Sequence, residues 1–515
     1  MVQFISLEEA AALVKDNDTI ATEGFLRNAF PEQLSIALKE RFQKTASPKG
    51  LTLIYAAGQG GGAGTGLDHI AQEGLLKRVI AGHYNLSPSL GKLIAENKIA
   101  AYNLPQGTIS QLYRDTAAGK VGTITHVGLK TFVDPRVDGG KLNALAKEDV
   151  VEVVNVGGRE QLLYKAQPLN CCFLRGSYAD EKGNISLDRE AVTLNGLSIA
   201  QAVKRNGGKV IVQVGQIVKA GSLPAKSVHI PFIYVDAVVE VPFEIQTAEA
   251  AAGFVDVYSG ERRIPTNSLP PLPLDERKII GRRAAFALTP NSIVNLGIGM
   301  PESVAMVANE EGIGDYMTLT VESGPIGGVP AGGVIFGAAV NPDCILDQAY
   351  QFDFYDGGGL DLAYLGLAEC DEKGNINVSK MGPRVTGCGG FINITQNAKR
   401  LFYCGTFTGK GLKIKAENGK LVIVQEGSIK KFVKKVGHVT FSGEYAAQIG
   451  QPVLYITERA VFELQKDGLH LIEVAPGIDV EKDILNQMEF KPIIKGSPKL
   501  MDARIFKDAV IGLGK

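Results

Sequence analysis

A short segment that occurs twice most constrains the fold of this chain of 515 residues. The letters Asp-Glu-Lys-Gly-Asn-Ile fill positions 180–185 and return unchanged at 371–376, an offset of 191 residues. An acidic pair before Gly-Asn favours a tight turn, and the isoleucine then opens a strand. At the same offset, residues 208–212 and 399–403 both follow helix-like stretches and have the pattern of buried strands. Chance recurrence of common turn chemistry is the alternative, but the in-register strands favour an internal duplication.

The beginnings of the two halves also correspond. Residues 18–25, followed by Pro31-Glu32, resemble residues 292–302 at an offset of about 270. Because this offset exceeds that of the repeated turn, the first half contains roughly 80 additional residues.

A proline-rich segment separates the halves. Residues 260–275 contain four prolines within nine positions, which favours extended backbone over a regular element. We therefore expect an N-terminal domain at 1–259, a linker at 260–275 and a C-terminal domain at 276–515.

Short apolar runs alternate with amphipathic segments in both halves, a pattern typical of an α/β fold. The expected helices are 7–15, 32–43, 67–80, 276–287 and 302–310, and the expected strands are 51–56, 293–296 and 317–321. This alternation predicts two similar open α/β domains with largely parallel sheets. In such sheets, ligands bind beyond the carboxyl ends of the strands.

Charge and cysteine usage exclude several function classes. Lys and Arg number 54 and Asp and Glu 55, so the chain has no overall basic footprint for nucleic acid or an anionic membrane. Six cysteines form no CxxC pair and six histidines are scattered, so we expect neither a metal site nor a disulfide framework. The N-terminus lacks a secretory pattern, and no apolar run reaches 18 residues. We expect a cytoplasmic protein with no nucleic-acid or membrane partner.

Glycine is in excess, at 61 residues, and it is clustered. The cluster at 58–66 lies between an expected strand and an expected helix and resembles a phosphate cradle. The chain has no Gly-Lys-Ser/Thr and no Gly-x-Gly-x-x-Gly, which argues against a nucleotide hydrolase or an NAD enzyme. A mobile surface loop and a substrate lid both remain open for this cluster.

Glu322 ends an apolar strand and is followed almost only by glycine, proline and small apolar residues. A carboxylate in that setting would be partly desolvated yet reachable, and desolvation raises both its pKa and its nucleophilicity. The alternative is a solvated glutamate at a strand end, or one that accepts local backbone N–H groups.

Two further glycine clusters are candidates for ligand contact. Gly297, Ile298, Gly299 and Met300 link a strand to a helix start, where exposed N–H groups suit an oxyanion or anionic ligand, or form a plain turn. In the segment 387–390, we expect Gly389 and Gly390 to admit a ligand and Cys388 to be a small filler. No histidine adjoins this cysteine, which argues against a thiol nucleophile.

Four segments together resemble family I coenzyme A-transferases, with the propionate/acetate branch closest. They are Val321-Glu322-Ser323-Gly324, the turn at 297–301, the segment 387–390, and Leu104-Pro105-Gln106-Gly107-Thr108. Residues 73–78, 351–362 and 456–459 extend the likeness over essentially the whole chain. The resemblance implies a two-domain enzyme with its active site between the domains and the nucleophile, Glu322, in the C-terminal domain.

The resemblance also implies a mechanism without a permanently bound cofactor. Glu322 would attack an acyl-CoA to form an anhydride, and the released CoA would then form a γ-glutamyl-CoA thioester. Coenzyme A is thus a substrate and part of a covalent intermediate, and its small-molecule partners are an acyl-CoA and a carboxylate such as propionate, acetate, lactate or butyrate. The family further implies a homo-oligomer, either a dimer or a tetramer.

By motif match, Gln106 would face the substrate, and Gly24, Phe25 and Asn28 would lie near a carboxylate pocket. Oxyanion or CoA contacts are assigned to Asn377, Gly389, Gly390 and the turn Gly297–Met300. Some related transferases have Glu-Asn-Gly where this chain has Glu322-Ser323-Gly324, so the Ser323 side chain has no assigned role. A CoA-ester hydrolase, a 3-oxoacid CoA-transferase and a non-catalytic CoA-binding protein remain as rival readings.

Overall fold

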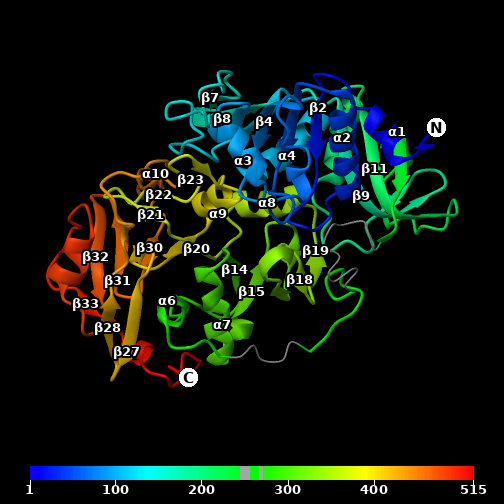
Figure 1. The fold of residues 1–515 in the computed structure, drawn as a ribbon. Helices are drawn as coiled ribbons and strands as arrows, with labels where there is room; N and C mark the ends of the chain where they lie inside the picture. The colour runs from blue at the N-terminus through cyan, green and yellow to red at the C-terminus, as the bar shows by residue number, and fades with distance from the viewer. Residues whose placement is uncertain (244–255, 266–270, 515) are drawn as a thin grey trace. The chain divides into compact units, whose positions relative to one another are not determined.

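The computed structural model describes residues 1–243, 256–265 and 271–514 (Figure 1). The chain forms two compact units, each with its own sheet. Unit 1 comprises 1–264, 321–353 and 382–393, and unit 2 comprises 265–320, 354–381 and 394–515. Residues 266–270 of the expected linker lie outside the described residues. The segment that carries Glu322 therefore packs with the N-terminal part of the chain.

Unit 1 is built on a parallel sheet with the strand order β1-β13-β11-β9-β2-β3-β4-β5. Its strands are β1 (Gln3–Phe4), β2 (Thr19–Thr22), β3 (Leu51–Tyr55), β4 (Leu76–Ala81), β5 (Ala100–Asn103), β9 (Cys171–Asp180), β11 (Lys209–Val218) and β13 (Ala237–Glu240). Near the carboxyl end of β9, β10 (Ile185–Ser186) pairs with β9 and with β12 (Val228–Ile230) in antiparallel fashion.

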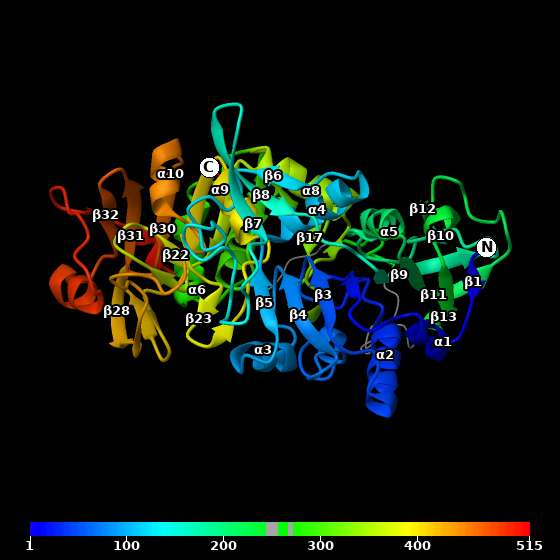
Figure 2. The same cartoon turned by 90° about the horizontal axis from the view of Figure 1, so that it is seen from above.

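Helices cover both faces of this sheet, as expected for strands buried on both sides. They are α1 (Leu7–Ala12), α2 (Glu32–Thr45), α3 (Pro88–Ala95), α4 (Gln106–Ala117) and α5 (Gly196–Arg205). Figure 2 shows α2 and α3 on one side of β3, β4 and β5, with α4 on the other side. A separate antiparallel sheet contains β6 (Gly122–Thr125), β8 (Arg159–Lys165) and β7 (Val151–Val156).

The strand order of unit 1 reverses direction at β2. From β2 the chain winds outward through β3, β4 and β5, whereas β9, on the other side of β2, leads to β11 and β13. Such a reversal leaves a crevice beyond the carboxyl ends of the two central strands, which is the usual ligand site of an open α/β sheet. Residues 23–28, which follow β2, begin at this crevice.

Unit 2 repeats the arrangement. Parallel strands run in the order β15-β14-β20-β25-β30, and β31, β32 and β33 extend the sheet. Their bounds are β14 (Ser292–Leu296), β15 (Met317–Thr320), β20 (Leu362–Gly366), β25 (Arg400–Cys404), β30 (Val453–Ile456), β31 (Ala460–Gln465), β32 (Gly468–Val474) and β33 (Lys499–Leu500). Here the order reverses at β14, between β15 and β20, so the turn at 297–300 lies at the carboxyl edge of the reversal.

The other helices of the C-terminal half are α6 (Glu276–Ala285), α7 (Ser303–Glu310), α8 (Gln348–Asp356), α9 (Phe391–Asn397) and α10 (Gly443–Ile449). The core of unit 2 gathers apolar side chains of α6 and α7, such as Ile279 and Val304, against the sheet. No helix among the described residues is long and apolar enough to cross a membrane.

The repeated six-residue segment forms the same turn in both units. Asp180 accepts hydrogen bonds from the backbone N–H groups of Lys182 and Asn184 at 2.9 and 3.0 Å. In the second copy, Asp371 accepts the corresponding bonds from residues 373 and 375, both at 3.0 Å. The glycine of each copy has a positive φ, +94° and +75°, which explains why the segment requires glycine there.

The predicted α/β class with largely parallel sheets is confirmed, and one predicted element is wrong. Residues 67–80 were expected to be helical, but they form a single 3₁₀ turn at Gly66–Asp68 and then enter β4. Leu67, Ile70 and Ala71 have helical spacing because they fill the core from one compact turn. Gly74, at a φ of +88°, then redirects the chain into the strand.

Candidate active site

Glu322 lies in a tight turn directly after β15. Within this turn, the N–H of Gly324 donates to the carbonyl of Val321 at 3.0 Å, and the N–H of Val321 donates to Pro325 at 2.9 Å. Val321 and Ser323 are buried on either side, whereas Glu322 itself is partly exposed. The hydroxyl of Ser323 donates to the carbonyl of Gly337 at 2.5 Å, so this side chain fixes the turn. The geometry therefore presents one reachable carboxylate on a rigid support.

Gly324 has no room for a side chain. Its φ is +129°, and a Cβ atom there would lie 2.0 Å from the carbonyl oxygen of Leu346. That carbonyl belongs to a residue whose own N–H donates back to Gly324 at 3.0 Å. The glycine after Ser323 is therefore required by close backbone approach.

We expect Gly324→Ala to lower the free energy of unfolding by about 2–4 kcal/mol, since the substitution combines an unfavourable φ with a backbone clash. Urea unfolding measures the loss. Gly332→Ala, in the same segment, is the matched control because a Cβ there would meet nothing within 4 Å. Equal unfolding midpoints for the two variants would contradict the assigned constraint.

The predicted residues after β2 lie against the Glu322 segment within unit 1. Phe25 and Asn28 close a small turn through reciprocal backbone bonds of 3.0 and 2.9 Å. The side-chain amide of Asn28 also donates to the carbonyl of Phe336 at 3.1 Å, and the rings of Phe25 and Phe336 lie 6.0 Å apart. Gly24 is buried between Phe25 and the end of β2. An apolar cluster joins the two segments: Phe25, Ala29, Ala57, Val192, Leu194, Val321 and Phe336.

Gln106 and Gly389 are also brought together. The N–H of Gln106, at the first position of α4, donates to the carbonyl of Gly389 at 2.9 Å. The Gln106 side chain is 3% exposed, yet its amide nitrogen Nε2 has no hydrogen-bond partner among the described residues. A buried donor without a partner is uncommon and is a candidate contact for an absent oxygen ligand. Gly390 is buried beside Gly389, directly before α9.

Cys388 is a buried filler, as expected. Its N–H donates to the side-chain oxygen of Asn103 at 2.9 Å, and its thiol contacts the carbonyl of Leu104 at 3.4 Å. Burial raises the pKa of this thiol, which keeps it protonated and unreactive.

The glycine-rich loop at 58–66 is anchored at both of its ends. At one end, Leu26 exchanges backbone bonds with Gly58 and Gly60 at 2.8 and 2.6 Å. At the other, the N–H of Gly66 donates to the carboxylate of Glu32 at 2.9 Å. The loop is therefore hydrogen-bonded to Leu26, within the turn at 25–28, a role that neither the lid nor the mobile-loop interpretation anticipated.

The residues predicted in the turn after β14 belong to unit 2. The N–H of Gly297 donates to Tyr364 in β20 at 2.8 Å, while Ile298 is 58% exposed. Gly299 has a φ of +86° with open space where a Cβ would stand, and Met300 begins a 3₁₀ turn. The turn thus offers accessible backbone at the carboxyl edge of the unit 2 sheet.

Asn377, predicted as an oxyanion donor, is already committed to the protein. Its side-chain amide donates to the carboxylate of Glu369 and to the carbonyl of Lys380, both at 2.8 Å. Since an amide has two hydrogens, this side chain offers none to an oxyanion in the observed arrangement.

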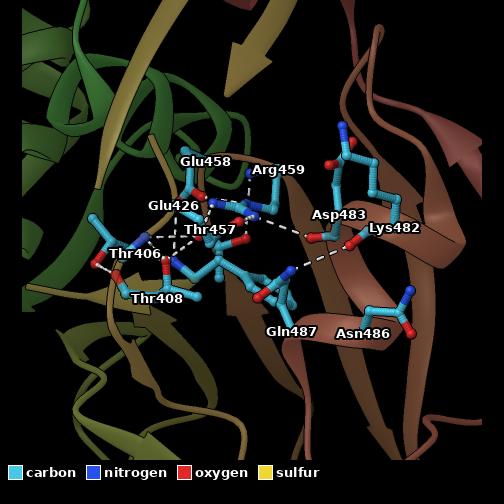
Figure 3. Close-up of polar contacts among 12 residues, drawn as sticks. Thr406, Thr408, Glu426, Thr457, Glu458, Arg459, Lys482, Asp483, Asn486 and Gln487 are labelled. Carbon is cyan, nitrogen blue, oxygen red and sulfur yellow. Dashed lines mark hydrogen bonds and ion pairs between the residues drawn. The ribbon is translucent and has the colours of Figure 1, made fainter. Parts of the chain in front are cut away.

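The segment Thr457-Glu458-Arg459 forms a buried charge network at the end of β30 (Figure 3). The fully buried guanidinium of Arg459 donates to Glu458 at 2.7 Å and to both oxygens of Glu426 at 2.7 and 3.0 Å. The second oxygen of Glu458 accepts the N–H of Phe407 at 2.8 Å. This network fixes the loops that follow β25 and β30.

The amine of Lys431 bonds to two loops at the same carboxyl edge of the unit 2 sheet. Lys431 donates to Thr406 at 3.0 Å and to the carbonyl of Leu367 at 3.4 Å, and burial lowers its pKa. Three loops beyond the carboxyl ends of β20, β25 and β30 are therefore tied together by side chains. The resemblance had pointed to 456–459 without giving the segment a role.

Sequence reasoning missed Glu23, a buried carboxyl at the end of β2. The signal that could have found it is its position, because Glu23 directly follows the buried strand β2 and precedes a glycine. Among the described residues, no group of three His, Cys, Asp or Glu side chains is placed to hold a metal ion.

Comparisons with known proteins identify the family. Residues 4–241 match the family model "Coenzyme A transferase". The chain is 44% identical to acetate CoA-transferase YdiF of Escherichia coli K12 over 512 residues, covering 99% of this chain and 96% of that protein. It is 42% identical to caffeate CoA-transferase of Acetobacterium woodii over 519 residues, covering 100% and 99%. A crystal structure of the acyl-CoA transferase YdiF from E. coli O157:H7 in a thioester complex with CoA superposes with a TM-score of 0.93 at 43% identity, covering 99% and 97%.

Proposed function

The chain belongs to the coenzyme A transferase family, and on that premise we propose that it moves CoA from a short-chain acyl-CoA to a monocarboxylate through Glu322. Propionate, acetate, lactate and butyrate are the proposed acyl groups. The observation that carries the proposal is the placement of Glu322, a partly exposed carboxylate in a turn whose neighbouring residues are buried and hydrogen-bonded.

The chemistry balances without an external energy source. The carboxylate oxygen of Glu322 attacks the thioester carbonyl, and CoA leaves as a thiolate from the resulting anhydride. The thiolate then attacks the γ-carbonyl of Glu322, which releases the first acid as a carboxylate and leaves a γ-glutamyl-CoA thioester. An incoming carboxylate reverses both steps. One thioester is broken for each thioester formed, so no ATP is required.

The residues gathered in unit 1 support this use of Glu322. Gln106 supplies a buried donor that has no protein partner, and we assign it to the oxygen of the acyl group. The backbone at Gly389 and Gly390 is proposed to contact the oxyanion or CoA. The same role is proposed separately for the turn Gly297–Met300, which belongs to unit 2. Gly24, Phe25 and Asn28, which pack against the Glu322 segment, are proposed to line the carboxylate pocket.

We expect Gln106→Leu to lower the rate of CoA transfer about 10²–10³-fold, the usual loss for one oxyanion donor. Stability should be unchanged or higher, because the substitution removes a buried unpartnered donor. Steady-state kinetics and urea unfolding measure the two effects. Gln111→Leu, on the same helix, is the control; it loses a 3.1 Å bond to Asp353 and should retain transfer. Equal rates of CoA transfer for the two variants would contradict the assignment of Gln106 to the acyl oxygen.

Mass spectrometry after incubation with propionyl-CoA alone tests the proposal directly. The peptide that carries Glu322 should gain the mass of CoA, and hydroxylamine should trap the same residue. Initial rates at several acceptor concentrations should give parallel lines, whereas intersecting lines would indicate a ternary complex. An unmodified Glu322 peptide together with intersecting lines would refute the covalent route.

The same experiments separate the rival activities. A hydrolase would release free CoA from propionyl-CoA with no acceptor present, and a 3-oxoacid transferase would prefer acetoacetate or succinate to acetate. We further propose a cytoplasmic homo-oligomer. The six cysteines support the first part of this proposal, since none forms a disulfide and five are buried. The family resemblance supports the second part.

A further inference from the structure

Glu23 is a carboxyl group that the proposed mechanism does not use. It follows β2, where the strand order of unit 1 reverses, and it is 2% exposed. Its oxygen Oε2 accepts the N–H of Asn195 at 3.1 Å. A Cβ atom on Gly196 would lie 3.0 Å from both carboxyl oxygens, so the group lies flat against the backbone at the start of α5.

No cation among the described residues is paired with Glu23. The guanidinium of Arg175, on the neighbouring strand β9, pairs through Nε with Glu190 at 3.0 Å, and its buried Nη1 has no hydrogen-bond partner among the described residues. His229, on β12, lies 3.5 Å from Asp347. An ionised carboxylate at this position would thus be buried without a counter-ion, which is strongly unfavourable.

The charged groups around Glu23 favour its protonated form. Burial raises the pKa of Glu23 well above its usual value. Hydrogen bonds from the backbone N–H groups of Asn195 and Arg175 oppose this shift, whereas the nearby carboxylates Asp347 and Glu190 add to it. The other titratable groups that face it are the Cys172 thiol from β9 and the Tyr113 hydroxyl from α4, and burial raises the pKa of both. Both therefore stay neutral and supply no compensating positive charge.

A polar chain leads from Glu23 to the segment that carries Glu322. The side-chain amide of Asn195 donates to Gln348 at 2.7 Å, and the N–H of Gln348 donates to the carbonyl of Leu194 at 2.9 Å. Gln348 lies in the segment 321–353, together with Glu322. The side-chain oxygen of Asn195 is buried without a partner among the described residues. A protonated Glu23 adds an O–H donor beside this residue, whereas an ionised one adds only another acceptor.

We propose that Glu23 works as a neutral, protonated positioning residue. It holds the loop at 193–196, which in turn holds Gln348 and the segment that bears the nucleophile. Because it is uncharged, it also keeps negative charge away from the region where a carboxylate substrate must approach Glu322. The statement about substrate approach rests on the proposed role of Glu322. The statement that Glu23 is protonated does not depend on that role.

The protonation state has a defined pH signature. Below about pH 4.5, Glu23 is protonated in both the folded and the unfolded chain, so it does not affect stability. Above that pH the unfolded chain releases the proton while the folded chain keeps it, so wild type loses stability relative to Glu23→Gln. The ratio of the two unfolding constants should rise by up to tenfold per pH unit until the folded pKa is reached.

Urea unfolding of wild type and Glu23→Gln between pH 5 and 8 tests this signature. Glu23→Gln should become progressively more stable than wild type as the pH rises. Glu190→Gln is the matched control, because it removes a buried carboxylate that does have a cation partner. It should be less stable than wild type near neutral pH. A Glu23→Gln variant less stable than wild type by the same amount at every pH would overturn the proposal.

Infrared spectroscopy supplies a second readout that does not depend on activity. Wild type labelled with carboxyl-¹³C glutamate should show a protonated-carboxyl band at about pH 6.5, and Glu23→Gln should lack it while Glu190→Gln retains it. If Glu23→Gln does not fold, a pH titration of the band in wild type still decides the matter. Absence of any such band in wild type would overturn the proposal.

Activity measurements then test the link to substrate. In wild type, kcat/KM for acetate should fall at alkaline pH as Glu23 ionises, whereas Glu23→Gln should keep its value. If Glu322 proves not to be the nucleophile, the unfolding and infrared results remain valid for Glu23. If those two results fail while Glu322 carries the CoA adduct, only the inference about Glu23 is lost.

Discussion

We expect Glu322→Gln to lower the rate of CoA transfer about 10⁴-fold or more, because in the proposed mechanism Glu322 is the group that forms the anhydride and the glutamyl thioester. The oxygen of an amide is a much weaker nucleophile than a carboxylate oxygen, so the first tetrahedral intermediate, from which the CoA thiolate leaves, does not form. The substitution preserves side-chain size, and the turn depends on Ser323 and Gly324, so folding should be retained. Exchange of CoA between propionyl-CoA and labelled acetate measures the loss.

Three controls give this result its meaning. Glu261→Gln, at an exposed glutamate of unit 1, should retain normal exchange. Binding of CoA to Glu322→Gln, measured by calorimetry, should persist and so separate lost chemistry from lost affinity. Glu322→Ala excludes slow regeneration of the acid from the amide. Normal exchange by the alanine variant would remove Glu322 from the mechanism entirely.

Arg459→Met should destabilise unit 2 by about 3–5 kcal/mol, the usual result of removing one partner from a buried ion pair. Arg459 is fully buried between Glu458 and Glu426. Its loss leaves the carboxylate of Glu458, which is also fully buried, without a cation partner. The loops after β25 and β30 should lose their fixed arrangement as a result. Thermal and urea unfolding measure the change, and hydrogen exchange locates it at residues 405–408 and 457–459.

The control for Arg459→Met is Arg504→Met, which breaks an exposed pair with Asp502 and should change stability by no more than about 1 kcal/mol. Combining Arg459→Met with Glu458→Gln should recover part of the lost stability, because the second substitution removes the unpaired buried charge of Glu458. Additive effects in the double variant would show that the two groups do not interact.

Much of the fold follows from local sequence signals. The repeated turn was predictable because an aspartate, a glycine and an asparagine at fixed spacing satisfy the backbone of a hairpin without help from elsewhere. The failed helix at 67–80 shows the limit of this reasoning. Its apolar spacing satisfies both a helix and a compact turn, and only the packing of Leu67 and Ile70 in the core decides between them.

Local backbone geometry around the proposed site was predictable where main-chain atoms approach closely. Gly324 and the Phe25–Asn28 turn are two such positions. Side-chain roles were harder to predict. Whether the amide of Asn377 is free depends on Glu369 and Lys380, and whether Glu23 is paired depends on segments more than 150 residues away. No local pattern encodes such partners.

Unit 1 is assembled from three separate segments of the chain, and this determines where the protein can be divided into fragments. A cut at the proline-rich linker looks natural on the sequence, but residues 1–264 alone lack the later segments 321–353 and 382–393. Phe25 would lose Phe336 and Val321 from its packing, and Gln106 would lose the carbonyl of Gly389. The two halves of the gene should therefore be expressed as interdependent fragments that fold on mixing. A split-protein reporter or circular permutant would be better opened in the exposed Gly157-Gly158 hairpin between β7 and β8.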